Sequence, residues 1–148
     1  MAIAYEEKGA GLHERIRTQG HWLVQEDGAW QSSDDAAVQA IIDAYTLDDA
    51  RAPIIAAIKQ EAMDRILAFL PAWKQSNLNA RMNELNEARF VRSLSIPEVY
   101  EVEAMRGIWD KAKAIRAASD AHEAALKALG TFSAVLAYPW RTTGWPTV

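Results

Sequence analysis

The sequence contains no cysteine, which excludes disulfide bonds, thiolate nucleophiles and zinc–sulfur sites. Positive charge is also scarce, since 16 lysines and arginines stand against 20 aspartates and glutamates, for a net charge of −4. We therefore expect no nucleic-acid binding through a basic surface. No apolar run approaches the roughly 20 residues of a membrane span, and the first residues lack the regions of a secretory signal. Neither membrane insertion nor secretion is expected.

Signatures of catalysis are missing as well. No serine lies in a Gly-x-Ser-x-Gly context, and no glycine-rich loop follows a predicted strand. The three histidines, His13, His21 and His122, lie in separate segments, so a shared metal site is not expected, and His122 is expected to be a partly buried packing residue. We expect no enzymatic activity, no cofactor and no metal.

Acidic residues cluster at three places, Asp34-Asp35, Asp48-Asp49 and Glu98 to Glu103. The first two clusters stand at predicted helix starts, where negative charge is favourable, and the third decorates a helix surface. A catalytic acid pair needs burial to separate its two pKa values, and nothing in the sequence predicts that burial. The clusters are interpreted as capping and surface charge.

The predicted fold is mainly α, in three parts. Residues 1–46 form a small α/β cap with a β-hairpin, residues 47–130 form a long antiparallel helical hairpin or coiled coil, and residues 131–148 form an extended tail rich in Trp and Pro. Within the cap, a helix over 11–19 ends at Gly20, and a second helix runs from Asp34 to Tyr45.

The stretch GHWLVQEDGAWQSSDD predicts the hairpin. A two-residue turn at Asp27-Gly28 would pair Gln25 with Trp30 and place the two tryptophans on opposite faces. A three-residue loop, Glu26 to Gly28, pairs Val24 with Trp30 and places Trp22 on the same face as both. Because a sheet that covers a core needs one apolar face, we expect the three-residue loop.

A start signal at Thr46 to Asp49 precedes an amphipathic helix, which Pro71 either kinks or ends. Helical spacing then continues with Trp73, Leu78, Met82, Leu85 and Ala88 as the apolar face. The stripe of Gln75, Asn79, Asn83 and Asn86 is expected to face solvent.

The longest helix is predicted from Pro97 to Leu129, ended by Gly130. Its apolar and small residues repeat at alternating spacings of three and four over more than three heptads. This heptad seam comprises Met105, Ile108, Ala112, Ile115, Ser119, His122, Leu126 and Leu129. The seam packs either on residues 55–88 of the same chain or on the same helix of another subunit.

Two tryptophans and two prolines follow in the tail, which cannot continue the helix. Its aromatic residues either pack back on the body or dock on a partner.

Four segments resemble small proteins encoded beside tail-fibre genes in tailed bacteriophages and prophages. They are GLHERIRTQGHWLVQEDGAWQSSDDAAVQAIIDAYT, IKQEAMDRILAFLPAWKQSNLNARMNEL, WDKAKAIRAASD and the terminal GWP. The last third also resembles the C-terminal part of tail-fibre assembly proteins, through Trp109 in a helix and the Trp145-Pro146 ending. Fibre-like N-terminal repeats, which some of those proteins carry, are not found here.

The resemblance implies a non-enzymatic structural or assembly protein of a phage tail, in the virion tail or in the host cytoplasm during assembly. Its partner would be a tail-fibre or baseplate protein, and a homo-oligomer is compatible with the heptad seam. The residues expected to make partner contacts are Trp140, Trp145, Pro146, Ile108, Ile115 and Leu126. The alternative function is a small phage-encoded inhibitor that binds a host enzyme or defence complex.

Overall fold

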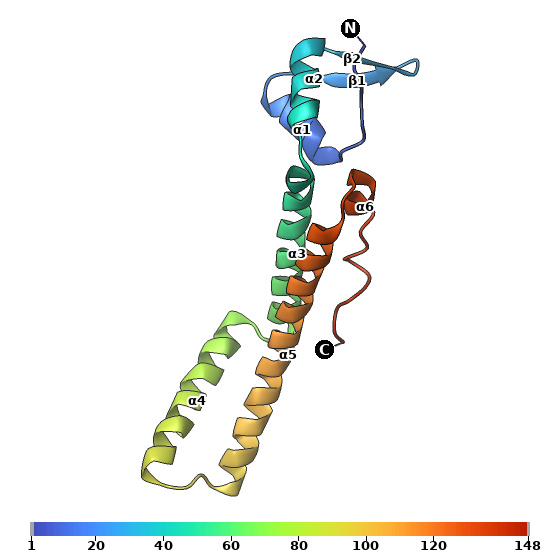
Figure 1. Ribbon diagram of the computed structural model, residues 1–148. Helices are drawn as coiled ribbons and strands as arrows, with labels where there is room; N and C mark the ends of the chain where they lie inside the picture. The colour runs from blue at the N-terminus through green and yellow to red at the C-terminus, as the bar shows by residue number, and fades with distance from the viewer. Residues whose placement is uncertain (1, 148) are drawn as a thin grey trace. The chain divides into compact units, whose positions relative to one another are not determined.

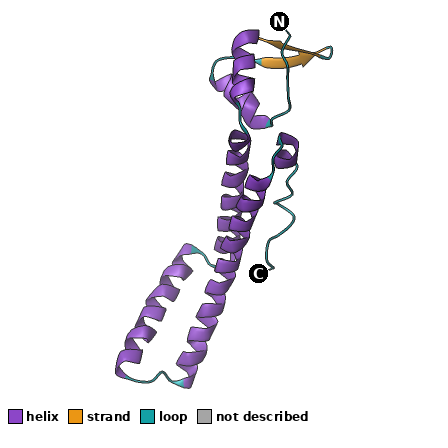
Figure 2. Ribbon diagram, in the orientation of Figure 1, coloured by secondary structure: helices purple, strands orange, loops and turns teal. Residues whose placement is uncertain are grey.

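The computed structural model describes residues 2–147, which form helices and one two-stranded β-hairpin, so the predicted fold class is confirmed (Figures 1 and 2). The chain packs as two units. Unit 1 holds the residues up to Ala57 together with His122–Arg141, and unit 2 holds Ile58–Ala121 with the residues from Thr142 onwards. This grouping differs from the three consecutive segments expected, because the end of the longest helix and the first part of the tail pack with the N-terminal residues.

Unit 1 contains most of the short elements. They are α1 (Ala10–Thr18), β1 (Leu23–Glu26), β2 (Ala29–Ser32), α2 (Asp35–Ala44) and α6 (Phe132–Leu136), joined by the first turns of α3 (Leu47–Phe69) and the last turns of α5 (Ile96–Ala128). The short helix α6 lies in the segment expected to be extended, and Thr131 caps it by accepting a hydrogen bond from the Ala134 amide. The buried apolar residues of unit 1 include Leu12, Ile16, Val38, Ile42, Tyr45, Leu126 and Val135.

The hairpin register differs from the expected one. Gln25 pairs with Trp30 and Glu26 with Ala29, so the loop has two residues, Asp27 and Gly28. Both adopt positive φ, 49° and 79°, which is the geometry of the tight turn that matches strand twist. The expectation of a three-residue loop was wrong because it required all the large apolar residues to share one face.

Instead, the two faces of the hairpin have separate roles. Trp30 is half-buried and stacks on Tyr5 at 4.0 Å between ring centroids. Trp22 and Val24 lie on the other face and remain 49% and 42% exposed. The N-terminal segment that carries Tyr5 therefore covers only one of the two tryptophans.

The helix boundaries follow the predicted start and stop signals. Gly20 after α1 has a φ of 84°, and Asp34 caps α2 by accepting from the Ala37 amide at 3.0 Å. Thr46 and Asp49 bond each other's backbone amides at 2.8 and 3.2 Å at the start of α3. Such reciprocal capping satisfies two amides that lack partners inside the helix.

Unit 2 is built from parts of α3 and α5 and from α4 (Ala72–Val91). Pro71 separates α3 from α4: it stands at the N-cap of α4 in an extended conformation, which resolves the alternative of a kink. Ala62, Ile66 and Leu70 of α3 pack with Ala112 and Ile115 of α5. Further along α5, Val102 and Met105 pack with Leu85 of α4, where the two helices run side by side (Figure 1).

The residues of the heptad seam of α5 pack against other elements of the same chain. Six of its eight residues are buried, and Ile108 and Leu129 are half-buried. The structure therefore supports the interpretation of the seam as packing within the chain. The apolar face of α4 is confirmed at Leu78, Met82 and Leu85, but Trp73 is 67% exposed and does not belong to it. Asn79, Asn83 and Asn86 of the predicted polar stripe are exposed as expected, whereas Gln75 is half-buried and donates to the Leu70 carbonyl at 2.9 Å.

Gly11 is a position where the core tolerates no side chain. A Cβ there would lie 2.4 Å from Oη of Tyr45, whose ring is buried and stacks on Phe132. We expect Gly11→Ala to lower the free energy of unfolding by about 1–2 kcal/mol despite the better helix propensity of alanine. Gly107→Ala in α5 is the control, because a Cβ there meets nothing within 4 Å. It should raise stability by about 0.5–1 kcal/mol, and denaturant unfolding compares the two variants; equal effects would contradict the steric argument.

Candidate interaction surfaces

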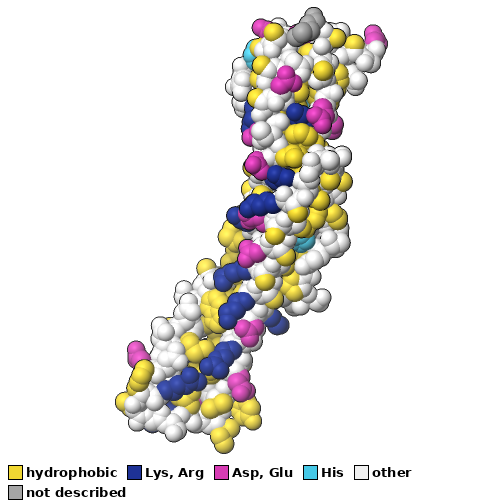
Figure 3. Space-filling view, viewed as in Figure 1, with side chains coloured by type: hydrophobic (Ala, Val, Ile, Leu, Met, Phe, Trp, Pro, Cys, Tyr) yellow, Lys and Arg dark blue, Asp and Glu magenta, His cyan; other side chains and the backbone are white. Residues whose placement is uncertain are grey.

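The largest group of exposed apolar side chains lies where α4 ends and α5 begins. Phe90 is 90% exposed, Val91 84%, Ile96 73% and Tyr100 67%. Val99 adds a side chain that is 43% exposed. We call these five residues the hairpin end; Figure 3 shows hydrophobic side chains on both sides of this end of α4 and α5, with other residues between them.

The hairpin end is held by a tightly bonded turn. Arg92 at the C-cap of α4 donates its amide to Ala88 and both guanidinium nitrogens to the Glu98 carboxylate, each at 2.8 Å. Glu98 also accepts from the Ser95 amide at 2.8 Å. These hydrogen bonds from Arg92 and then Ser95 lower the pKa of Glu98 to about 2. The exposed residues are therefore presented on a fixed turn.

Next to the hairpin end, packing between α4 and α5 keeps these two helices together. Leu85, Val102 and Met105 form a buried cluster, flanked by Leu78, Met82 and Leu94. Arg81 of α4 bonds Glu101 of α5 through two nitrogens at 2.7 and 3.0 Å, which raises the pKa of Arg81 and lowers that of Glu101. The pair of helices α4 and α5 thus has its own buried core, and the exposed residues of the hairpin end are not part of that core.

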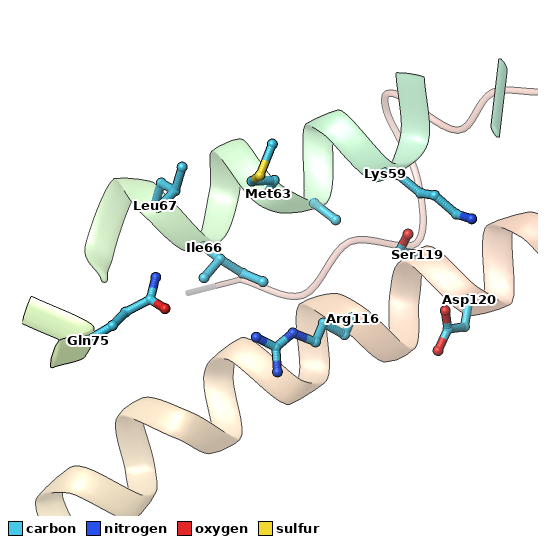
Figure 4. A pocket seen from close by; sticks show the side chains of 9 residues that line it. Lys59, Met63, Ile66, Leu67, Gln75, Arg116, Ser119 and Asp120 are labelled. Atoms are coloured by element: carbon cyan, nitrogen blue, oxygen red, sulfur yellow. The ribbon is translucent and has the colours of Figure 1, made fainter. Parts of the chain in front are cut away.

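A second surface of unit 2 is a hollow of about 480 Å³ between α3 and α5, with Gln75 of α4 at one end (Figure 4). Buried Ala62, Ile66 and Ser119 form its floor, and exposed Met63 and Leu67 extend the apolar surface. Lys59, Arg116 and Asp120 complete the lining. We call this hollow the α3–α5 groove; its size lies within the range of ligand-binding sites.

Unit 1 has a smaller hollow of about 330 Å³, lined by His13, Ile16, Arg17 and the exposed hairpin face with Trp22, Leu23 and Val24. Only Trp22 and Val24 are large exposed apolar residues here, so this surface is less apolar than the hairpin end.

Of the predicted contact residues on the seam, Ile115 and Leu126 are in the core and Ile108 is half-buried. Ile115 and Leu126 have no exposed surface, and Ile108 packs against the cluster around Ala112. The assignment of Ile115 and Leu126 to partner contacts is corrected, because neither side chain is exposed to a partner, whereas partner contacts by half-buried Ile108 stay a prediction.

The predicted tail residues are half-buried. Trp145 packs against the cluster formed by α3 and α5, with the Arg65 guanidinium 4.9 Å from its ring centroid. Pro146 beside it is half-buried, and Trp140, in unit 1, has the Arg141 guanidinium 4.9 Å from its ring. The structure supports the interpretation that the tail packs back on the body, and partner contacts by its remaining exposed surface stay a prediction.

Among the described residues, the three histidines lie in separate hydrogen-bonded settings. Each histidine bonds a hydroxyl group: His13 that of Tyr5 at 2.9 Å, His21 that of Ser33 at 3.0 Å, and His122 that of Tyr138 at 2.8 Å. His122 is buried, as expected for a packing histidine. Within residues 2–147, no group of three or more His, Asp or Glu is arranged to hold a metal ion.

The carboxylates with strongly lowered pKa values are tied to arginines at helix ends. Arg15 donates to both oxygens of Asp49 at 2.5 and 3.0 Å and stands 4.7 Å from the ring centroid of Tyr45. The hydrogen bonds from Arg15, followed by that from the Thr46 amide, hold the pKa of Asp49 well below its usual range. Asp49 joins α1 to the start of α3 and has a structural role.

Two features escaped the sequence analysis. Lys8 is 7% exposed and donates to the carbonyls of Ile42 and Tyr45 at the end of α2, at 2.8 and 3.3 Å. The hairpin end was also missed, although the segment RFVRSLSIPEVY does carry a signal. It places Phe90, Val91 and Ile96 directly beside an interhelical turn, where a two-helix hairpin offers little to cover them.

Comparison of the chain with protein-family models, curated protein sequences and solved structures gave no match. Among the described residues, none of the helices is both long enough and apolar enough to span a membrane.

The ion pair of Asp49 gives a pH-dependent prediction. Asp49→Asn should lower the free energy of unfolding by about 1–2 kcal/mol near neutral pH, through the weakened cap and ion pair. Because the folded pKa is lowered, this stabilisation is complete above the unfolded pKa of about 3.9 and is lost as the pH falls through the folded value. The difference between wild type and variant should therefore shrink in urea unfolding below a pH of about 4. Asp48→Asn, at a side chain that is 89% exposed, should cost only a few tenths of a kcal/mol. A loss that is independent of pH would contradict the assignment.

A second prediction concerns the tail. Trp145→Ala should destabilise unit 2 by about 1–3 kcal/mol, because it removes packing on the α3 and α5 cluster and the contact with Arg65. Trp73→Ala is the matched control, since that ring is 67% exposed, and it should change the free energy of unfolding by less than about 0.5 kcal/mol. Unchanged stability of Trp145→Ala in denaturant unfolding would instead leave this ring available to a partner.

Proposed function

We propose that this protein is a non-enzymatic structural or assembly protein of a bacteriophage tail that binds a tail-fibre or baseplate protein. The observation that supports a binding role is the hairpin end, where four large apolar side chains are each at least two-thirds exposed. Several large apolar side chains left exposed at one end of a helix pair are typical of a surface that another molecule covers. The phage context comes from the sequence resemblance of the four segments quoted above.

The arrangement of the titratable groups is consistent with a role without catalysis. The most strongly shifted carboxylates, Asp49 and Glu98, bond arginines and backbone amides at helix starts. Neither lines the α3–α5 groove or the hollow of unit 1. Exposed aromatic residues such as Trp73, Phe90 and Tyr100 are the types that dominate binding energy at protein interfaces.

Co-expression of the tagged chain with fibre and baseplate proteins from the same phage or prophage tests this function. We expect one of them to co-purify with the wild-type chain in stoichiometric amount. Replacing Phe90, Ile96 and Tyr100 of the hairpin end together by serine should reduce the captured amount at least about tenfold, because a few large side chains carry most of the energy of an interface.

The matched control replaces Asn79, Asn83 and Asn86 by serine, three exposed polar residues of α4. This variant should capture the partner as the wild type does. If no fibre or baseplate protein co-purifies with the wild-type chain, the proposed function is wrong; if the two triple variants lose equal amounts, the hairpin end is not the binding surface.

A further inference from the structure

The N-terminal segment of unit 1, residues 2–8, has neither helix nor strand structure (Figure 2), and we call it the strap. Tyr5 stacks on Trp30 of the β-hairpin, and the Gln39 side chain of α2 accepts from the Ala4 amide at 2.8 Å and donates to the Ala4 carbonyl at 3.3 Å. Among the described residues, no backbone–backbone hydrogen bond joins the strap to another element. Because side-chain contacts hold it in place, the strap should open at a lower free energy than the helices around it.

The strap ends in a buried cation, Lys8. Its ammonium group donates to the carbonyls of Ile42 and Tyr45, lies 3.8 Å from the exposed Glu6 carboxylate, and stands 4.9 Å from the ring centroid of Phe132 in α6. An ammonium group gives up much of its hydration when it is buried, so these contacts offset a desolvation cost. When the strap lifts, the ammonium group regains its water. The closed and open positions of the strap are therefore closer in free energy than the burial of Lys8 by itself indicates.

The short helix α6 depends on contacts from the strap. Lys8 contacts the Phe132 ring, and Gly9, directly after the strap, lies so close to Leu136 that a Cβ at Gly9 would be 2.7 Å from Cδ2 of that leucine. With five residues, α6 has no helical stability of its own and keeps its order only where neighbouring elements hold it. Tyr45 supplies a further contact by stacking on Phe132, and Lys8 bonds the Tyr45 carbonyl as well. Lifting the strap thus removes two of the contacts that hold α6.

We propose that the strap is a latch on α6: when the strap lifts, α6 loses its helical order, and residues 131–138 become accessible. Residues 131–140 carry three aromatic side chains and no charged one, so the latch decides whether an uncharged aromatic segment is covered. The coupling is reciprocal by linkage, and loosening α6 must therefore also favour the open strap. The latch acts within unit 1 and does not depend on the binding role proposed above.

Two variants perturb the two ends of this coupling without removing any contact between them. Tyr5→Ala removes the ring that stacks on Trp30 and leaves Lys8 and α6 unchanged. Thr131→Val removes the hydroxyl group that caps α6 by accepting from the Ala134 amide, and leaves the strap unchanged. Both variants act at positions that are at least half-buried or exposed, so the chain should keep the circular dichroism spectrum of the wild type.

Cleavage by trypsin after Lys8 under native conditions measures the open strap. Lys8 is 7% exposed, so the protease reaches this bond only when the strap has lifted, and the cleavage rate follows the population of the open form. Both Y5A and T131V should raise this rate at least about fivefold, the lower end of typical coupling between two sites. The matched controls are W22A, on the hairpin face that the strap does not cover, and T18V, at an exposed hydroxyl of α1; both should be cleaved as the wild type is.

Amide hydrogen exchange measures the order of α6 in the same variants. The amides of Val135 and Ala137 donate to the carbonyls of Thr131 and Ser133, at 3.1 and 3.0 Å, and they exchange when α6 opens. Y5A should raise the exchange rate of these two amides at least about fivefold, although Tyr5 has no contact with α6. Amides of α4 in unit 2 are the internal reference, and their exchange should stay as in the wild type, since the opening is local.

Three results would overturn the proposal. In the first, Y5A leaves the cleavage rate at Lys8 unchanged, or raises it while α6 exchanges as in the wild type. In the second, T131V speeds exchange in α6 without speeding cleavage at Lys8. In the third, the α4 amides gain as much exchange as those of α6, which means that the whole chain unfolds. None of these results bears on the capture of a fibre or baseplate protein, so the latch and the proposed function fail or succeed separately.

Discussion

The structure depends on the buried stripe along α5. Short amphipathic helices are marginal in water by themselves, so the other helices need an apolar surface to pack on. In unit 2, α5 offers Ala112 and Ile115 to α3, and Val102 and Met105 to α4. In unit 1 its last turns supply Leu126, which has no exposed surface. One continuous helix thus provides core residues in both units, and small residues such as Ala112 let the neighbouring backbone approach closely.

The same arrangement explains why apolar surface is left over. Along α5, the α3 contact at Ala112 and Ile115 gives way to the α4 contact at Val102 and Met105. Two helices in contact bury one stripe each, and residues beyond that stripe remain exposed unless a third element covers them. Trp145 of the tail supplies such a cover beside Arg65, but Met63, Leu67 and the hairpin end have none among the described residues.

Local signals in the sequence were sufficient for the helices other than α6, which lies in the segment expected to be extended. The caps at Asp34, Thr46 and Ser95, and the spacing of the α5 seam, depend on residues three or four positions apart, which the sequence displays directly. The register of the β-hairpin depended on a contact with a residue that is distant in the sequence. The ring of Tyr5 stacks on Trp30 and gives that face of the sheet its cover, so Trp22 did not need to join it. No pattern within the hairpin contains that information.

Residue type also did not predict which aromatic side chains are exposed. Aromatic residues beside proline in the tail were the natural candidates for partner contacts, yet Trp145 is packed on its own unit. Phe90 looked like an ordinary residue near the end of a helix, and it is 90% exposed because the turn at Arg92 reverses the chain just beyond it. Periodicity along one helix shows which residues share a face, but the length of the neighbouring helix decides where cover ends.

The discontinuous composition of unit 1 has a consequence for the order of folding. The chain leaves unit 1 after Ala57 and returns at His122, and Arg51 bonds the carbonyls of Leu126 and Leu129, at 3.2 and 2.5 Å, across a separation of more than 70 residues. During synthesis, the helices of unit 2 emerge from the ribosome and can pair while unit 1 still lacks its last segment. Closing a long loop costs less entropy when the intervening chain is already compact. A chain interrupted before His122 would keep the pairing of α3 with α5 in unit 2 but lack Trp145, which packs on that pair, and its first unit would stay open.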